Sequence, residues 1–119
     1  MELSNLEKTI LADCVDDDTG LWEVVWHVNG GGYSAKMLPE WVRGQTIELL
    51  MKLLSKGLII IGTVHKDNNY EFFPYHESNE SILEKIEVEW DELGPPDIGD
   101  KFWIEPSEKG KELAKTLML

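Results

Sequence analysis

The chain has 119 residues, of which 42% are hydrophobic and 29% charged, and this composition is typical of one globular domain rather than of a disordered segment. Its formal net charge of −12 excludes nonspecific attraction to nucleic acid or anionic lipid, because such binding depends on Lys and Arg neutralising phosphates. No apolar run approaches the ~20 residues of a membrane span and no leader pattern is present, so we expect a cytoplasmic protein with no membrane contact. With one cysteine, Cys14, no internal disulfide can form.

The N-terminal part predicts two short helices. Ser4 and Glu7 have the spacing of a capping box and predict a helix that runs to about Val15. Residues 16–20 then form a turn, whose spacing does not fit a calcium loop because Gly20 stands at the fifth position, where a ligand is needed. Residues 21–28 are apolar enough for a strand, but their valines share one helical face, and we predict a second helix.

The middle of the chain predicts one long helix and a buried strand. Pro39 suits the first helical position, where its missing N–H is not needed. Apolar residues then recur at helical spacing until Gly57 ends the helix. The apolar, β-branched run at 58–61 favours a strand buried in the core.

A hairpin is expected after that strand. A two-residue turn at 68–69 would pair His65 with Phe72 on the following strand. Pro74 lacks the N–H that a central strand needs, so the second strand should end there or lie at an edge of the sheet.

Residues 77–100 predict an inserted amphipathic helix with an acidic surface. Ser81 and Glu84 repeat the spacing of a capping box. Apolar residues follow at steps of three and four up to Leu93, and the two prolines after Gly94 prevent the helix from continuing. A short strand at 102–105 and a last helix beginning near residue 107 complete the chain.

The order of long helix, glycine, strand, short turn and strand resembles the second half of the winged helix-turn-helix superfamily. The run from Leu49 to Ile59 looks like its recognition helix and first wing strand. Residues 107–113 resemble the Thr/Ser-x-x-Gly-x-x-Leu start of the last helix in many winged-helix regulators, where Gly110 would allow close approach to the sheet. The resemblance covers about residues 35–76 and 101–117 and concerns architecture, since a fold alone assigns no reaction, ligand or partner.

We therefore predict a single α+β domain over residues 1–119. It is a winged-helix-like helical bundle with a small antiparallel sheet, and an acidic helix at about 77–100 is inserted before the last strand. The predicted core consists of apolar residues from the long helix, the strands and the last helix: Leu50, Leu53, Leu54, Leu58, Ile60, Phe102, Ile104, Leu113 and Leu117.

No pattern of catalytic or metal-binding residues is present in the sequence. The three histidines stand in no His-x-x-x-His arrangement, and one cysteine cannot form Cys-x-x-Cys. There is no Gly-x-Ser-x-Gly elbow, and Cys14 has no cationic neighbour in sequence that would stabilise a thiolate. We expect no catalytic residue, no metal and no cofactor, and we predict that the protein is not an enzyme.

The charge is distributed unevenly along the chain. Residues 1–29 carry seven acidic residues and one lysine, a net charge of −6, and residues 77–100 carry nine acidic residues and one lysine, a net charge of −8. Residues 36–66 instead carry five basic and two acidic residues, a net charge of +3. This distribution supports two different functions.

The favoured hypothesis is a small acidic protein-binding module. Inhibitors and immunity-type proteins that neutralise a basic partner, such as a nuclease toxin, have this size and charge. A homodimer is an open alternative for its oligomeric state. The candidate partner-binding residues are the acidic stripe of the inserted helix and the acidic turn: Glu80, Glu84, Glu87, Asp91, Asp16, Asp17 and Asp18.

The alternative is a winged-helix transcriptional regulator that binds DNA through the long helix and the wing. We rank it second because the helix offers one Arg and few Asn or Gln for contacts to base edges, and acidic segments flank it. The candidate DNA-binding residues are the basic residues of the middle segment: Lys36, Arg43, Lys52, Lys56 and Lys66.

Overall fold

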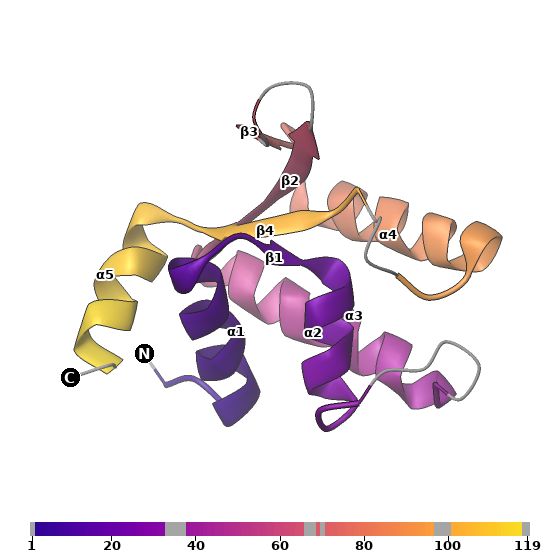
Figure 1. Ribbon diagram of the computed structural model, residues 1–119, viewed down its shortest axis with the longest axis horizontal. Helices are drawn as coiled ribbons and strands as arrows, with labels where there is room; N and C mark the ends of the chain where they lie inside the picture. The colour runs from indigo at the N-terminus through magenta and orange to yellow at the C-terminus, as the bar shows by residue number, and fades with distance from the viewer. Residues whose placement is uncertain (1, 33–37, 66–68, 70, 97–100, 118–119) are drawn as a thin grey trace.

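The computed structural model describes residues 2–32, 38–65, 69, 71–96 and 101–117. Within these residues the chain forms an α+β domain with a winged-helix-like arrangement (Figure 1). Its elements in chain order are α1 (Asn5–Asp16), β1 (Thr19–Gly20), α2 (Leu21–Val28), α3 (Glu40–Ser55), β2 (Ile59–His65), β3 (Glu71–Pro74), α4 (Asn79–Leu93), β4 (Trp103–Pro106) and α5 (Glu108–Leu117).

The predicted helices of the N-terminal half form, with one shift in a boundary. The capping box of α1 is present, because the Ser4 hydroxyl accepts from the backbone N–H of Glu7 and the Glu7 carboxylate accepts from the N–H of Ser4, both at 3.2 Å. Residues 21–28 are helical as predicted. Pro39 is the N-cap of α3 rather than its first helical residue, with φ −63° and ψ 145°. The fixed φ of proline fits either position, so sequence could not separate them.

The four strands form one antiparallel sheet in the order β1-β4-β2-β3. The predicted turn at 16–20 is wrong in its second half, because β1 lies there and pairs Thr19 with Ile104 of β4. A two-residue strand has no pattern of its own, and this one exists because β4 offers it a partner. Helices α1, α2 and α3 lie on one side of β4, while α4 and α5 extend toward opposite ends of the molecule (Figure 1).

The register of the β2–β3 hairpin differs by one residue from the prediction. His65 pairs with Glu71 and Val64 with Phe72, so the pairing of His65 with Phe72 is wrong. The observed register sets Gly62 beside the backbone of β3, where an added Cβ would lie 2.3 Å from the Phe73 carbonyl oxygen. Only glycine allows this approach. As predicted, β3 ends at Pro74 and is an edge strand.

The inserted helix α4 starts earlier than predicted. Its N-cap is Ser78, whose hydroxyl accepts from the backbone N–H of Ser81 at 3.1 Å, whereas the Ser81 hydroxyl donates to Glu77 at 2.7 Å. The helix ends at Gly94 with a φ of 87°, as predicted. Leu93, expected on its buried face, is 76% exposed, because the last turn extends past the elements that cover the rest of that face.

Most of the predicted core is buried. The exceptions are Ile60 and Leu117, which are 37% and 43% exposed. Side chains alternate along a strand, so Ile59 and Ile61 of β2 face the helices and Ile60 faces outward. The predicted core residues that are buried are Leu50, Leu53, Leu58, Phe102 and Ile104, and those partly buried against them are Leu54 and Leu113.

Candidate functional site

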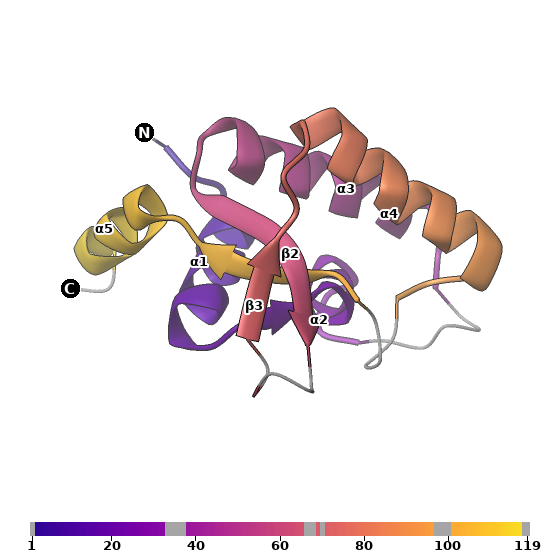
Figure 2. The ribbon, with the colours of Figure 1, turned by 90° about the horizontal axis from the view of Figure 1, so that it is seen from above.

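The acidic stripe predicted on the inserted helix is divided by the packing of α4 along α3, which Figure 2 shows from above. Glu87 and Asp91 face Arg43 of α3. The Arg43 guanidinium lies 3.4 Å from the Glu87 carboxylate, donates to the Asp91 carboxylate at 2.6 Å, and donates to the Glu87 carbonyl oxygen at 3.0 Å. Its carbon lies 5.8 Å from the ring centroid of Trp90, within cation–π range. These two acids therefore join α4 to α3.

The ionisation of this group follows from the contact. The hydrogen bond with Asp91 raises the pKa of Arg43, and the hydrogen bond from Arg43 lowers the pKa of Asp91. Both side chains are held in their charged forms and satisfy each other. By contrast, Glu80 and Glu84 are exposed on α4 and have no ion pair or hydrogen bond to another described residue through their side chains.

The basic residues proposed for DNA binding are also engaged within the protein. Lys52 pairs with Glu48 one turn away at 3.1 Å, and Lys56 pairs at 2.6 Å with Glu7, which is 4% exposed. Arg43 is held by α4, as described above. Lys36 and Lys66 lie outside the described residues. The positive segment of the sequence therefore presents three internally neutralised cations in the part of the chain that is described.

The outward face of α3 is the surface on which the sequence placed the candidate DNA contacts. It carries few groups that suit a phosphate backbone, since the charge of Lys52 is balanced by Glu48. The acidic helix α4 also lies alongside it (Figure 2). The exposed side chains of this face are Trp41, Gln45, Glu48 and Lys52.

The acidic turn forms a separate group at the end of α1. Asp17 is the C-cap of the helix, and its carboxylate accepts from the backbone N–H of Asp18 at 2.8 Å. The turn borders a hollow of about 300 Å³, whose other lining residues include Glu105 and Lys111. Burial, together with a hydrogen bond and repulsion from Asp18, raises the pKa of Glu105 to about 7. Glu105 therefore takes up a proton at a higher pH than an ordinary carboxyl group does.

The structure does not bring the two predicted acidic groups together. The end of α1 lies on the α5 side of the sheet, whereas α4 extends from the other side (Figure 1). Sequence reasoning missed the contact of Asp18 with Glu105, because the two residues are joined only by the pairing of β1 with β4. No local sequence pattern predicts a contact between residues so far apart in the chain.

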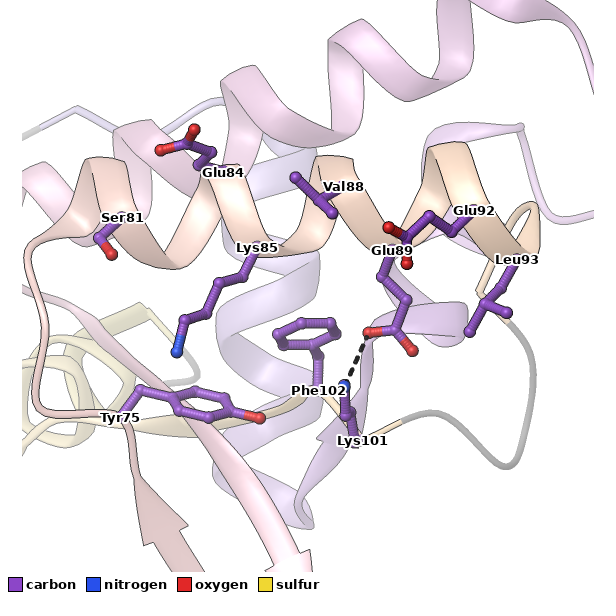
Figure 3. A pocket seen from close by; sticks show the side chains of 10 residues that line it. All are labelled: Tyr75, Ser81, Glu84, Lys85, Val88, Glu89, Glu92, Leu93, Lys101 and Phe102. Atoms are coloured by element: carbon purple, nitrogen blue, oxygen red, sulfur yellow. Dashed lines mark ion pairs between the residues drawn. The ribbon is translucent and has the colours of Figure 1, made fainter.

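A groove of about 570 Å³ beside α4 was also missed (Figure 3). Val88 and Leu93 are exposed along it, and the buried ring of Phe102 lies at its base. A signal was present in the sequence. Val88 falls on the acidic face of the helix, where the helical period predicts a polar residue.

His27 and Cys14 both make contacts within the protein. His27 contacts the Asp13 carboxylate at 2.5 Å and packs edge-on against Trp26. Burial raises the pKa of the Cys14 thiol to about 12, so it stays protonated at neutral pH and is no activated nucleophile. Across the described ranges, no group of three or more His, Cys, Asp or Glu side chains is placed to hold a metal ion. None of the helices in those ranges is long and apolar enough to cross a membrane.

Comparison of the chain with protein-family models, curated proteins and solved structures gives no match.

Proposed function

We propose that this protein is a non-enzymatic binding module of the cytoplasm that binds and neutralises a basic protein, in the manner of an inhibitor or immunity-type protein acting on a nuclease toxin. The observation that carries the proposal is the asymmetry of its charged groups. Arg43, Lys52 and Lys56 are each paired with an acid inside the protein. Glu80 and Glu84 are exposed and have no such partner in the described part of the chain.

The net charge of −12 should also affect the rate at which a partner associates. An acidic surface attracts a basic protein over a distance of about a Debye length, roughly 10 Å at moderate salt, and raises the rate of association. Like charges at helical spacing on α4 also repel one another, by a few tenths of a kcal/mol for each pair. A basic partner relieves that repulsion on binding.

The alternative proposal is a DNA-binding regulator, and one observation favours it. The winged-helix-like arrangement leaves the outward face of α3 exposed, including the ring of Trp41 and the amide of Gln45. We rank it second because Lys52 on that face is neutralised by Glu48, and the acidic helix α4 lies beside it.

A capture experiment distinguishes the two proposals. The purified protein is immobilised, exposed to extract from its host, and eluted with rising salt, and the same protein is tested for retardation of duplex DNA. The double variant Glu84→Gln/Glu92→Gln is compared with Glu108→Gln/Glu112→Gln on α5, which removes the same charge at the other end of the molecule.

We expect the wild type and the α5 variant to capture a basic protein that salt releases, and the α4 variant to capture less of it. Retardation of duplex DNA at physiological salt, without capture of a basic protein, would contradict the proposal and favour the regulator.

A further inference from the structure

The centre of the acidic face of α4 is apolar. Val88 is an apolar side chain that is 46% exposed. It lies one helical turn after Glu84 and one turn before Glu92. Residues four apart are neighbours on a helix surface, so two carboxylates flank this side chain. Neither Glu84 nor Glu92 has a side-chain partner among the residues that the structure describes. An exposed valine between two unsatisfied acids contributes little to folding.

Val88 is also one lip of the groove shown in Figure 3. Leu93, at the end of α4, also lines the groove and is the most exposed large hydrophobic residue in the described part of the chain. The ring of Phe102 closes the base, and Tyr75 borders the groove from the segment after β3. Val88, Leu93 and Phe102 thus give the groove apolar surface, next to charged side chains that line it as well.

The two lysines that line the groove are each compensated by an acid of the same protein. Lys85 contacts the Glu77 carboxylate at 2.5 Å and lies 5.3 Å from the centroid of the Tyr75 ring. Lys101 lies 3.7 Å from the Glu89 carboxylate, along the dashed line in Figure 3. What stays uncompensated at the rim is negative, so an anionic ligand, a nucleic-acid backbone or an anionic membrane is repelled there.

We infer that this groove is the docking site for an amphipathic basic segment of a partner protein. An apolar side chain of the segment packs on Val88 and Leu93, and flanking Arg or Lys side chains bind Glu84 and Glu92. An apolar centre that is desolvated inside a polar rim is the usual arrangement of a binding hot spot. The inference rests on the proposed function and narrows it, because a purely cationic partner would leave Val88 and Leu93 exposed to water.

Labelled synthetic peptides test the inference directly by fluorescence anisotropy. The first is a helix-forming peptide of arginine, alanine and two leucines four residues apart, and the second replaces both leucines by serine at the same charge. The wild type should bind the first peptide about tenfold or more tightly than the second, a difference of roughly 1.4 kcal/mol. Val88→Ser/Leu93→Ser should remove that difference and leave binding of the serine peptide unchanged.

Matched variants separate the roles of charge and apolar contact. Leu6→Ser/Leu117→Ser exchanges two leucines that are also partly exposed, on α1 and α5, and should behave as the wild type. Glu84→Gln/Glu92→Gln should weaken both peptides and reduce the dependence of binding on salt. Circular dichroism checks that each variant is folded, which the exposure of the substituted residues favours.

Two results would overturn the inference, and they differ in what they imply for the proposed function. Equal binding of both peptides by the wild type would exclude an apolar docking site while leaving a charge-driven binding module intact. Failure of the wild type to bind either basic peptide would contradict the inference and the proposed function together.

Discussion

Glu7 is a charged residue in an almost closed environment. Its side chain is buried between α1 and the end of α3, where it accepts from the Lys56 ammonium at 2.6 Å and from the backbone N–H of Ser4. Burial alone would raise the pKa of Glu7, but the hydrogen bonds from Lys56 and Ser4 outweigh it and lower the pKa. Lys56 therefore acts as a structural counter-ion of Glu7. This pairing accounts for a basic residue at position 56 without any role in DNA binding.

Replacing Lys52 of α3 and Lys56 at its C-cap, one at a time, tests the structural role of Lys56. Lys56→Met leaves the buried carboxylate of Glu7 without its cation, and we expect a loss of about 1 to 3 kcal/mol in the free energy of unfolding. Lys52→Met removes an exposed pair with Glu48, and we expect a loss of only about 0.3 to 0.5 kcal/mol. Urea denaturation of both variants measures the difference, and equal effects would contradict the structural role of Lys56.

Gly110 illustrates a residue whose role the sequence did indicate. An added Cβ would lie 2.1 Å from the Leu58 carbonyl oxygen, so Gly110→Ala must push α5 away from β2. We expect a loss of about 1 to 3 kcal/mol, as for other overpacked sites. Gly44→Ala is the control, because its Cβ meets nothing within 4 Å in the middle of α3. That variant should gain about 0.5 to 1 kcal/mol from helix propensity. Thermal unfolding of both variants checks whether Gly110→Ala is less stable, and Gly44→Ala more stable, than the wild type.

Glu105 gives a dependence of stability on pH. Its pKa in the folded protein is about 7, against an ordinary value of 4.5, because of burial and its contact with Asp18. The folded state therefore holds a proton that the unfolded state loses, and this contribution to stability is full below about pH 4.5 and disappears as pH rises to about 7.

The expected result is a smaller fall in stability between about pH 5 and pH 7 in Glu105→Gln than in the wild type. Urea denaturation at both pH values measures the change in the free energy of unfolding of each protein. Subtracting the change in the variant from that in the wild type removes the contributions of Glu7 and the other acids that the two proteins share. The same fall in both proteins would contradict the raised pKa of Glu105.

At the scale of elements, the contact of α4 with α3 divides the acidic stripe into a structural half and an exposed half. Glu87 and Asp91 hold Arg43, whereas Glu80 and Glu84 face water. This division could not be predicted from the spacing of the acids, because helical periodicity places all four on one face and is silent about which helix lies beside it.

Charge reversal in the two halves should therefore have different effects. Glu87→Lys/Asp91→Lys places two cations against Arg43, and we expect a loss of stability with faster hydrogen exchange of the α4 amides. Glu80→Lys/Glu84→Lys makes the same change of charge on the exposed half and should shift stability by about 0.5 kcal/mol or less. If the two variants are equally stable, Arg43 does not hold α4 in place.

The helices could be predicted from the sequence and the details of the sheet could not. Apolar periodicity and the Ser4 cap are local signals, and α1, α2 and α3 form where those signals indicated. Strand β1 and the register of β2 with β3 depend on partners far away in the chain. The groove beside α4 needs α4, the segment after β3 and the start of β4 together, so only the odd placement of Val88 hinted at it.

For the molecule as a whole, a winged-helix-like arrangement carries a strongly acidic charge distribution, and we propose that duplex DNA is not its ligand. The net charge is −12, and Arg43, Lys52 and Lys56 are occupied by acids. We propose that the inserted helix gives the arrangement its binding surface. The fold positions α4, and the uncompensated acids around Val88 select the partner.

One measurement tests that central claim most directly. The isotope-labelled protein is titrated with the arginine and leucine peptide and, separately, with duplex DNA, and its backbone amide shifts are followed by NMR. We expect the peptide to shift the amides of α4 and of Phe102, the amides of the α3 face to stay unchanged, and DNA at physiological salt to have no effect. Shifts on the outward face of α3 with DNA, and none on α4 with the peptide, would contradict it.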